Sequence, residues 1–390
     1  MDNKILIICH CSLRGNSIGL IEEFLTQFDS LKKDGCQIDL FDTNFFECHN
    51  PSDYKVDNYY YLNLGIVDRI ARKIPGLRVK YLHKKILQQL EELLRVGNYD
   101  LVVMYSVPPY SDKAVDVAHK YGTKITLFPW GSEVLRAKGE VAEAVKRAHI
   151  DADFIAGHEG ANLLINARDN YKVEAKRIKA RKTFPKGVQI LKEIIGKQNR
   201  KEMSSDIGIP YAEYNIICGY SGREGHRHKE IIEAIYANKE ELPNNYQLVF
   251  PVTYACEGKY IEELKSICSE KGLNAVFLTK YMSDEHIAKL HLLTDLYINI
   301  QPSDNGNSFM TEALYAGNKI ITGRWLNYSQ YEKYGIPYYL IDKIEDLTVI
   351  LNKLFKCELD EVEVPKALKK EYEMPEGYDN GKIWREMLAD

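Results

Sequence analysis

Short apolar runs alternate along this chain with longer segments whose apolar residues recur at helical spacing. In the first half, the runs that predict buried strands are 4–10, 37–42, 100–106, 123–130 and 151–159. The same alternation starts again in the second half, at 214–222, 246–252, 275–282, 295–303 and 318–323. Strands that are separated by helices pair in parallel through right-handed crossovers. The pattern therefore predicts an α/β protein with two Rossmann-like, doubly wound domains.

The join between the two arrays is polar and contains glycine and proline, as is typical of a linker. This stretch is KQNRKEMSSDIGIP, residues 197–210. We predict an N-terminal domain over 1–195, a C-terminal domain over 206–365 and a helical tail over 366–390. We expect the tail to pack back toward the N-terminal domain. Doubly wound sheets bind ligands at the carboxyl ends of their strands, so we expect the two domains to face each other across a cleft.

Composition narrows the class of partner. The formal net charge of −4 lacks the basic surplus that binding to nucleic acid normally requires, so no nucleic-acid partner is expected. No apolar run reaches about 18 residues, the length that predicts a membrane span. The 8 cysteines contain no C-x-x-C pair, and several lie in apolar runs, which is typical of buried thiols in a reducing compartment. These features predict a cytoplasmic protein.

The most informative stretch is IQPSDNGNSFMTEALYAGNKIITG, which begins at Ile300. A strand ends there, a polar loop follows, and a helix is predicted from Ser308. The free N–H groups and positive dipole end of such a helix suit a diphosphate, which makes Asn307 and Ser308 candidate donor-binding residues. Glu312 lies one turn into the helix, and Asp304 precedes it in the loop. The same residues also fit a capping network, in which Asp304 or Ser308 caps the helix and Glu312 is a solvated acid.

This stretch resembles the signature of family 4 glycosyltransferases. In that signature an acidic residue is followed eight positions later by the Glu of an E-A-x-x-x-G segment. Asp304 and Glu312 occupy the two acidic positions, although the usual aromatic-glycine pair is replaced by Asn305, Gly306 and Asn307. The resemblance implies a GT-B fold with a nucleotide-sugar donor. It further implies that Asp304 lies near the transferred sugar, as a catalytic residue, and that Glu312 holds the donor ribose.

A second segment, FPWGSEVLR (128–136), resembles the G-S-D segment in the N-terminal domain of the same family. Trp130 stands where that family often has a histidine that contacts the donor sugar. The W-G-x-[DE] version is similar to the lipid-linked Fuc4NAc transferases of family 56, as are the stretches GYSGREGHRH and PVTYACEGKYIEELK. Family 4 retains the configuration of the anomeric carbon and family 56 inverts it. The sequence leaves both outcomes open.

The loop after the first strand of the second domain, GYSGREGHRHK (219–229), combines glycines with basic residues. Glycine lets a backbone approach a ligand closely, and arginine offers a planar fork to phosphate. Arg223, His228 and Lys229 are therefore candidate ligands of the donor diphosphate. A basic cluster at a helix N-terminus opposes the helix dipole, and a bound anion would relieve that conflict. The alternative is a solvated loop with a basic helix start.

Three further assignments concern other loops. Glu133 is the candidate general base toward the acceptor hydroxyl, or else the cap of the helix that begins beside it. The loop HCSLRGNSIGL resembles the first loop of GT-B enzymes, which makes Gly15 and Asn16 candidate donor-binding residues, with ordinary turn residues as the alternative. Tyr281 is expected beside the donor base.

Taken together, the motifs predict a glycosyltransferase that moves a sugar from a nucleotide-sugar donor to a saccharide or lipid-linked acceptor. No metal-ligand pattern stands at a strand end, so no cofactor or metal is expected. The basic, aliphatic stretch 67–90 either forms a solvated helical face or makes peripheral contact with the inner membrane surface. A nucleotide-sugar epimerase and a non-catalytic nucleotide-sugar-binding protein remain alternatives.

Overall fold

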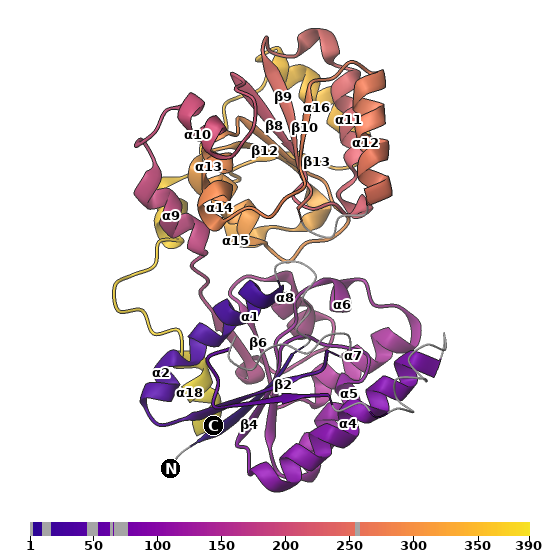
Figure 1. The fold of residues 1–390 in the computed structure, drawn as a ribbon, viewed down its shortest axis with the longest axis vertical. Helices are drawn as coiled ribbons and strands as arrows, with labels where there is room; N and C mark the ends of the chain where they lie inside the picture. The colour runs from indigo at the N-terminus through magenta and orange to yellow at the C-terminus, as the bar shows by residue number, and fades with distance from the viewer. Residues whose placement is uncertain (1–2, 10–16, 45–53, 63–64, 66–76, 254–257) are drawn as a thin grey trace. The chain divides into compact units, whose positions relative to one another are not determined.

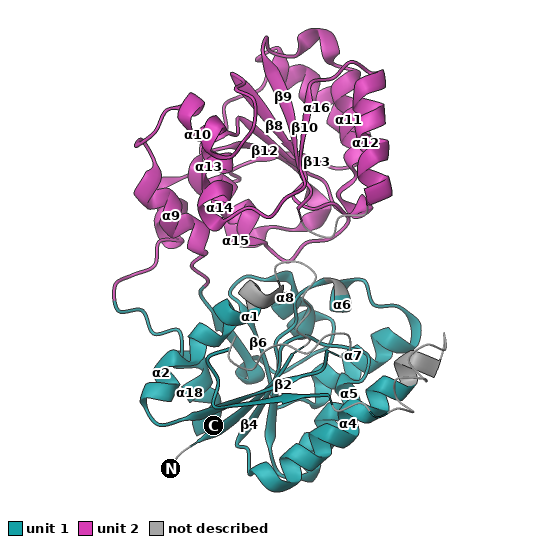
Figure 2. Ribbon diagram, in the orientation of Figure 1, with its two compact units in different colours: residues 1–182, 377–390 teal, residues 183–376 magenta. Residues whose placement is uncertain are grey.

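The computed structural model describes residues 3–9, 17–44, 54–62, 65, 77–253 and 258–390. The chain divides into two compact units, which Figure 2 colours separately. Unit 1 comprises residues 1–182 and 377–390, and unit 2 comprises residues 183–376. Each unit has its own sheet and its own hydrophobic clusters.

The described part of unit 1 contains a seven-stranded parallel sheet in the order β3-β2-β1-β4-β5-β6-β7 (Figure 1). Its strands are β1 (Lys4–Cys9), β2 (Gln37–Asp42), β3 (Asn58–Tyr61), β4 (Leu101–Met104), β5 (Lys124–Leu127), β6 (Phe154–His158) and β7 (Ile178–Arg181). Its helices are α1 (Ser17–Leu25), α2 (Asp29–Lys33), α4 (Leu77–Gly97), α5 (Ser111–Lys120), α6 (Ser132–Leu135), α7 (Gly139–Asp151), α8 (Asn162–Asp169) and α18 (Lys382–Ala389).

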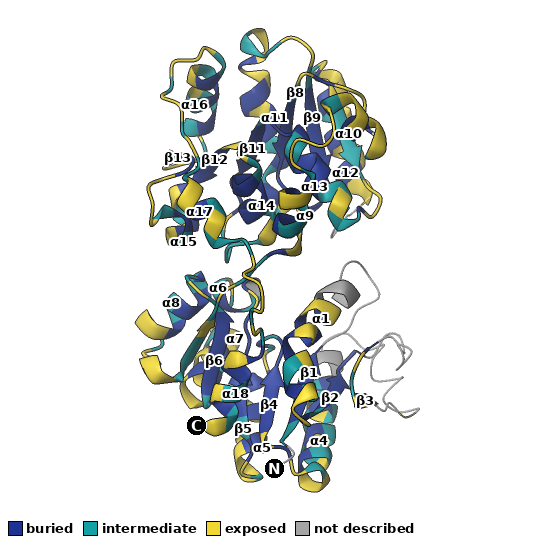
Figure 3. Ribbon diagram, turned by 90° about the vertical axis from the view of Figure 1, so that its left-hand side faces the viewer, coloured by how far each residue is buried: buried dark blue, intermediate teal, exposed yellow. Residues whose placement is uncertain are grey.

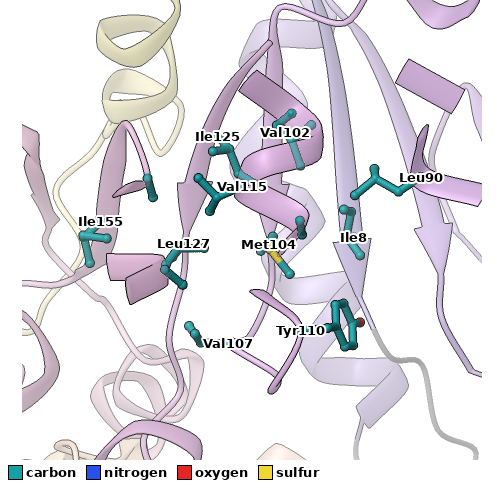
Figure 4. Packing of buried hydrophobic residues seen from close by; sticks show 14 of the residues in the cluster. Ile8, Leu90, Val102, Met104, Val107, Tyr110, Val115, Ile125, Leu127 and Ile155 are labelled. Atoms are coloured by element: carbon teal, nitrogen blue, oxygen red, sulfur yellow. The ribbon is translucent and has the colours of Figure 1, made fainter. Parts of the chain in front are cut away.

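Both faces of this sheet are covered, because apolar side chains of each central strand alternate between two clusters. Leu6 and Ile8 of β1 join the cluster formed with α4, α5, α7 and α8, part of which Figure 4 shows around Met104 and Leu127. Ile5 and Ile7 point to the opposite face, where α1, α2 and α18 cover them. Helix α18 comes from the far end of the sequence and completes this second layer.

The described part of unit 2 contains a six-stranded parallel sheet in the order β10-β9-β8-β11-β12-β13. Its strands are β8 (Tyr214–Cys218), β9 (Tyr246–Pro251), β10 (Ala275–Leu278), β11 (Leu296–Asn299), β12 (Lys319–Gly323) and β13 (Tyr339–Ile341). Its helices are α9 (Lys186–Ile194), α10 (Arg200–Asp206), α11 (His228–Tyr236), α12 (Gly258–Glu270), α13 (Asp284–Leu293), α14 (Ser308–Ala316), α15 (Ser329–Glu332), α16 (Asp346–Phe355) and α17 (Lys366–Glu371). Figure 3 shows the central strands buried between helices with exposed outer faces.

The predicted fold class, an α/β protein with two doubly wound Rossmann-like halves, is confirmed by these two parallel sheets. The unit boundaries differ from the predicted ones. Unit 2 begins at Thr183 and not after residue 195, because α9 is amphipathic and packs Val188 and Leu191 against Ala288 and Tyr315. The predicted tail 366–390 is also divided. Helix α17 stays in unit 2, where Leu368 is buried, whereas α18 belongs to unit 1.

The basic stretch 67–90 is only partly described, since 67–76 lie outside the described residues. Its remainder opens α4, whose Leu82, Ile86 and Leu90 are buried against the sheet. Among the helices that the structure describes, none is both long enough and apolar enough to cross a membrane.

Candidate functional site

The topology of the unit 2 sheet indicates that a ligand binds at the carboxyl ends of its central strands. Strands β8 and β11 are neighbours, but the chain leaves β8 toward β9 on one side and leaves β11 toward β12 on the other. In open parallel sheets, ligands bind outside the carboxyl ends of the strands at such a switch point. The loops that part there are 219–227, after β8, and 300–307, after β11. They contain the predicted residues Arg223, Asp304 and Asn307.

Two buried histidines stand behind the first of these loops. The rings of His226 and His228 stack with their centroids 5.9 Å apart. Gly219 takes a left-handed conformation (φ 68°), and a Cβ there would lie 3.0 Å from His228 Nε2, so the backbone needs glycine at this position. His228 Nδ1 lies 3.2 Å from the hydroxyl of Tyr260, while Nε2 is buried without a hydrogen-bond partner among the described residues.

Burial lowers the pKa of His228 from its ordinary 6.5 to about 4. The imidazole is therefore neutral at pH 7. His228 was predicted as one of the basic ligands of the diphosphate, but its ring carries no charge. A neutral ring offers a hydrogen bond to a ligand and adds no positive charge to the loop.

The lowered pKa of His228 predicts a specific pH dependence of stability. Between pH 6.5 and 4 the unfolded chain binds a proton at His228 that the folded chain does not, so the free energy of unfolding falls as the pH falls through this window. At pH 4.5 we expect a loss of about 2 kcal/mol relative to pH 7 from this residue. Urea denaturation of wild type and His228→Gln at both pH values measures it. Equal pH dependence in the two proteins would contradict the assignment.

The basic residues of the same loop differ in their surroundings. Arg223 is exposed. Lys229 forms an ion pair with Glu263 of α12 at 2.6 Å, in which both side chains are about half exposed. Such an exposed pair contributes little to stability, so a diphosphate would compete with Glu263 at small cost. The donor-binding roles of Arg223 and Lys229 stay predictions.

The loop after β11 is organised by the N-terminal cap of α14. The cap residue is Asn307, whose Oδ1 accepts a hydrogen bond from the backbone N–H of Met310 at 2.7 Å. The carboxylate of Asp304 accepts hydrogen bonds from the Asn305 backbone N–H, the Asn307 side-chain amide and the Tyr328 hydroxyl. Burial raises the pKa of Asp304, and these hydrogen bonds oppose that shift. Asp304 thus fixes the loop that presents Ser308, the exposed first residue of α14.

Aromatic packing joins the two loops. Tyr220 stacks on Phe309 of α14 with ring centroids 5.7 Å apart. Its hydroxyl accepts a hydrogen bond from Gln301 Nε2 at 3.2 Å, and the carbonyl of Gln301 accepts one from the indole of Trp325 at 2.8 Å. The residues predicted from two separate motifs are therefore held in one region at the end of the sheet.

Glu312 lies one turn further along α14 and is 7% exposed. Its carboxylate sits against Gly187 in the first turn of α9, where an added Cβ would be 2.3 Å from Glu312 Cδ. Its Oε2 is 3.3 Å from Nε2 of the buried His291. Sequence reasoning missed both neighbours. The available signals were a glycine at the start of an amphipathic helix and a histidine among leucines in LHLL.

The remaining predicted residues belong to unit 1, to another loop of unit 2, or to the part of the chain outside the described residues. Glu133 of unit 1 accepts hydrogen bonds from the backbone N–H groups of Trp130 and Gly131, so it caps the short helix α6. Tyr281 is 72% exposed on the loop after β10. Gly15 and Asn16 lie outside the described residues. The catalytic role of Glu133 and the donor role of Tyr281 stay predictions.

Comparison with known proteins identifies the fold of the chain. No protein-family model matches the sequence, and no curated protein matches it. Solved structures do match over nearly the whole chain. A glycosyltransferase from Rickettsia africae superposes with a TM-score of 0.68 at 12% identity, covering 100% of this chain and 96% of the other.

Two further structures agree. WaaG, a glycosyltransferase involved in lipopolysaccharide biosynthesis, gives a TM-score of 0.64 at 14% identity, covering 98% of each chain. HepE of Anabaena, in complex with UDP-glucose, gives 0.63 at 14% identity, covering 99% of this chain and 98% of the other. At these identities the likeness establishes the fold. The chain has the two-domain GT-B fold of glycosyltransferases, as the sequence motifs predicted.

Proposed function

We propose that this protein is a glycosyltransferase that moves a sugar from a nucleotide-sugar donor to a saccharide or lipid-linked acceptor. The observation that carries the proposal lies at the β8–β11 switch point. There the loops 219–227 and 300–307 are linked by the stacking of Tyr220 on Phe309, and the second loop leads into the capped start of α14. The binding of UDP-glucose by HepE, which shares the fold, supports a uridine nucleotide as the donor.

In the proposed donor complex, the diphosphate lies at the first turn of α14, near Ser308 and Arg223. The free N–H groups and dipole of a helix start stabilise an anion, and arginine adds a planar fork of donors. Glu312 accepts hydrogen bonds from the ribose hydroxyls. Tyr281, on the loop after β10, borders the base.

The proposed transfer forms a bond between the acceptor oxygen and the anomeric carbon and breaks the bond from that carbon to the diphosphate. Unit 1 supplies the acceptor side, and Glu133 is the proposed base that takes the hydroxyl proton. The leaving diphosphate gains negative charge, which the α14 start and Arg223 offset in place of a metal ion. Asp304 supports the reaction by holding Asn307 and the loop beneath the transferred sugar.

We expect loss of the Arg223 side chain to slow turnover and removal of metal ions to leave the rate unchanged. Arg223→Ala removes a charge-assisted hydrogen bond to the diphosphate, so kcat/KM should fall about 10- to 100-fold. A chelator such as EDTA should leave the rate unchanged. Release of nucleoside diphosphate from labelled donor, with and without acceptor saccharides, measures both.

The matched control is Arg324→Ala, which removes an exposed arginine paired with Asp342 at 2.7 Å in the same unit. It should retain the wild-type rate. Conversion of the donor sugar in the absence of any acceptor would instead favour an epimerase. Loss of activity with EDTA that added Mg²⁺ restores would contradict the proposed stabilisation of the leaving group.

A further inference from the structure

Three helices of unit 2 meet around the carboxylate of Glu312. Helices α9, α13 and α14 pack against one another and share a small apolar cluster (Figure 1). Helix α14 carries Glu312, α9 contributes Gly187 from its first turn, and α13 contributes His291 from its last turn. The carboxylate is therefore confined between a glycine backbone and an imidazole ring.

The ring of His291 is fully buried, and neither of its nitrogens has a hydrogen-bond partner among the described residues. Its Nε2 lies 3.3 Å from Oε2 of Glu312, slightly beyond the usual range of an N–H···O hydrogen bond. A buried polar group without a hydrogen bond is costly, and the hydrogen bonds of a functional site commonly tighten in its complex. Glu312 is thus the partner that the ring of His291 faces.

The position of His291 is fixed by other contacts. Its backbone carbonyl accepts hydrogen bonds from the side-chain amide of Asn318 at 2.8 Å and from the backbone N–H of Thr294 at 3.1 Å. The imidazole packs on Phe309 of α14, with ring centroids 4.3 Å apart. The terminal torsion of a glutamate is soft, so a rotation of the Glu312 carboxylate would align it with Nε2 at small cost.

Glu312 has acceptor capacity left over. No hydrogen bond reaches its carboxylate from the part of the chain that the structure describes, and 9% of its side chain is exposed. An ionised carboxylate accepts hydrogen bonds at both oxygens. With Oε2 bonded to His291, the plane of the carboxylate would be set and Oε1 would remain for a ligand.

We propose that His291 is a positioning residue of the donor site: its Nε2–H donates a hydrogen bond to Oε2 of Glu312 and so directs Oε1 to the ribose hydroxyls. The inference rests on the proposed function, in which Glu312 holds the donor ribose. A site built to bond a hydroxyl is left with an unpaired polar group when that hydroxyl is missing, so it discriminates strongly against the deoxy analogue. His291 thereby makes the site select nucleotides that carry the ribose hydroxyls.

Calorimetric titration with UDP and with 2′,3′-dideoxyuridine diphosphate tests the role of His291. Wild type should prefer UDP, and His291→Phe, which keeps a ring but removes both nitrogens, should lower that preference about 10-fold. His291→Gln, whose amide can donate from nearly the position of Nε2, should retain most of it. The matched control His149→Phe replaces another fully buried histidine, in α7 of unit 1, and should discriminate like wild type. An unchanged preference in His291→Phe would overturn the inference.

A double variant separates positioning from a general effect on packing. If His291 acts through Glu312, adding His291→Phe to Glu312→Gln should leave the preference for UDP at the level of Glu312→Gln alone. A further loss in the double variant would show that His291 acts independently of Glu312, which contradicts the inference.

The state of the His291 ring can be read without a nucleotide. Nitrogen NMR of protein labelled in histidine should show a proton on Nε2 of His291, assigned by the loss of its signals in His291→Phe, and the Nε2 signal should shift in Glu312→Gln. A neutral ring protonated only at Nδ1 could not donate from Nε2 and would overturn the inference. Failure of the donor proposal would instead appear as absent UDP binding with this Nε2 signal and its shift intact.

Discussion

Replacing Trp384 by alanine is expected to lower the free energy of unfolding by about 3–5 kcal/mol. Trp384 lies on α18 and is fully buried, with its ring stacked on Phe28 at a centroid distance of 4.7 Å and edge-on to Phe24 at 5.8 Å. The substitution leaves a large cavity beneath the terminal helix, which completes one face of the unit 1 sheet. Urea denaturation followed by circular dichroism measures the loss.

The control for this prediction is Arg385→Ala on the same helix. Arg385 is partly exposed and pairs with Asp34 and Asp379 at the surface, so its loss should cost about 1 kcal/mol or less. If Trp384→Ala were no less stable than Arg385→Ala, α18 would not be an integral part of unit 1.

Gly187→Ala is expected to weaken nucleotide binding about 10- to 100-fold. The new methyl group would lie 2.3–2.7 Å from the three carboxyl atoms of the buried Glu312, so the carboxylate would have to shift. Displacement of that carboxylate would break its proposed charge-assisted hydrogen bonds to the donor ribose, each worth about 1.5–3 kcal/mol. Alanine favours a helix over glycine by about 1 kcal/mol, so stability should change less than affinity. Calorimetric titration with UDP measures the effect.

Gly258→Ala is the matched control, because Gly258 also begins a helix of unit 2 and an added Cβ there meets no atom of the described residues within 4 Å. It should bind UDP like wild type. Wild-type affinity in Gly187→Ala would show that the carboxylate of Glu312 does not hold the nucleotide.

The strands inside the two sheets could be predicted from the sequence, whereas of the four edge strands only β10 was predicted. Strand β1 was predicted at 4–10 and is observed at Lys4–Cys9, because a strand covered on both faces is a nearly continuous apolar run. The missed strands β3, β7 and β13 all lie at sheet edges. Residues of β3 and β7 are largely exposed or half-buried, so NYYY and IKAR carry little of that signal. Edge strands depend on the neighbouring strand rather than on their own composition.

The candidate site shows a similar division. The sequence predicted Asp304, Asn307 and Glu312 as site residues. In the structure, Asp304 and Asn307 lie in the loop before α14, and Glu312 lies in α14 itself. Their hydrogen bonds were not predictable. The sequence offered Asp304 or Ser308 as the cap of α14, but the backbone geometry makes Asn307 the cap. The neutral state of His228 depends on burial by distant elements, which local sequence does not report.

The central claim is that unit 2 binds the nucleotide of a sugar donor through Glu312 and the loops around it. Calorimetric titration with uridine, guanosine and adenosine diphosphates tests it most directly, with wild type compared to Glu312→Gln and to Glu262→Gln, an exposed acid on α12. The account predicts that one diphosphate binds wild type and Glu262→Gln equally, and that Glu312→Gln binds it about 10- to 100-fold more weakly. Binding of no diphosphate, or equal binding by all three proteins, would contradict it.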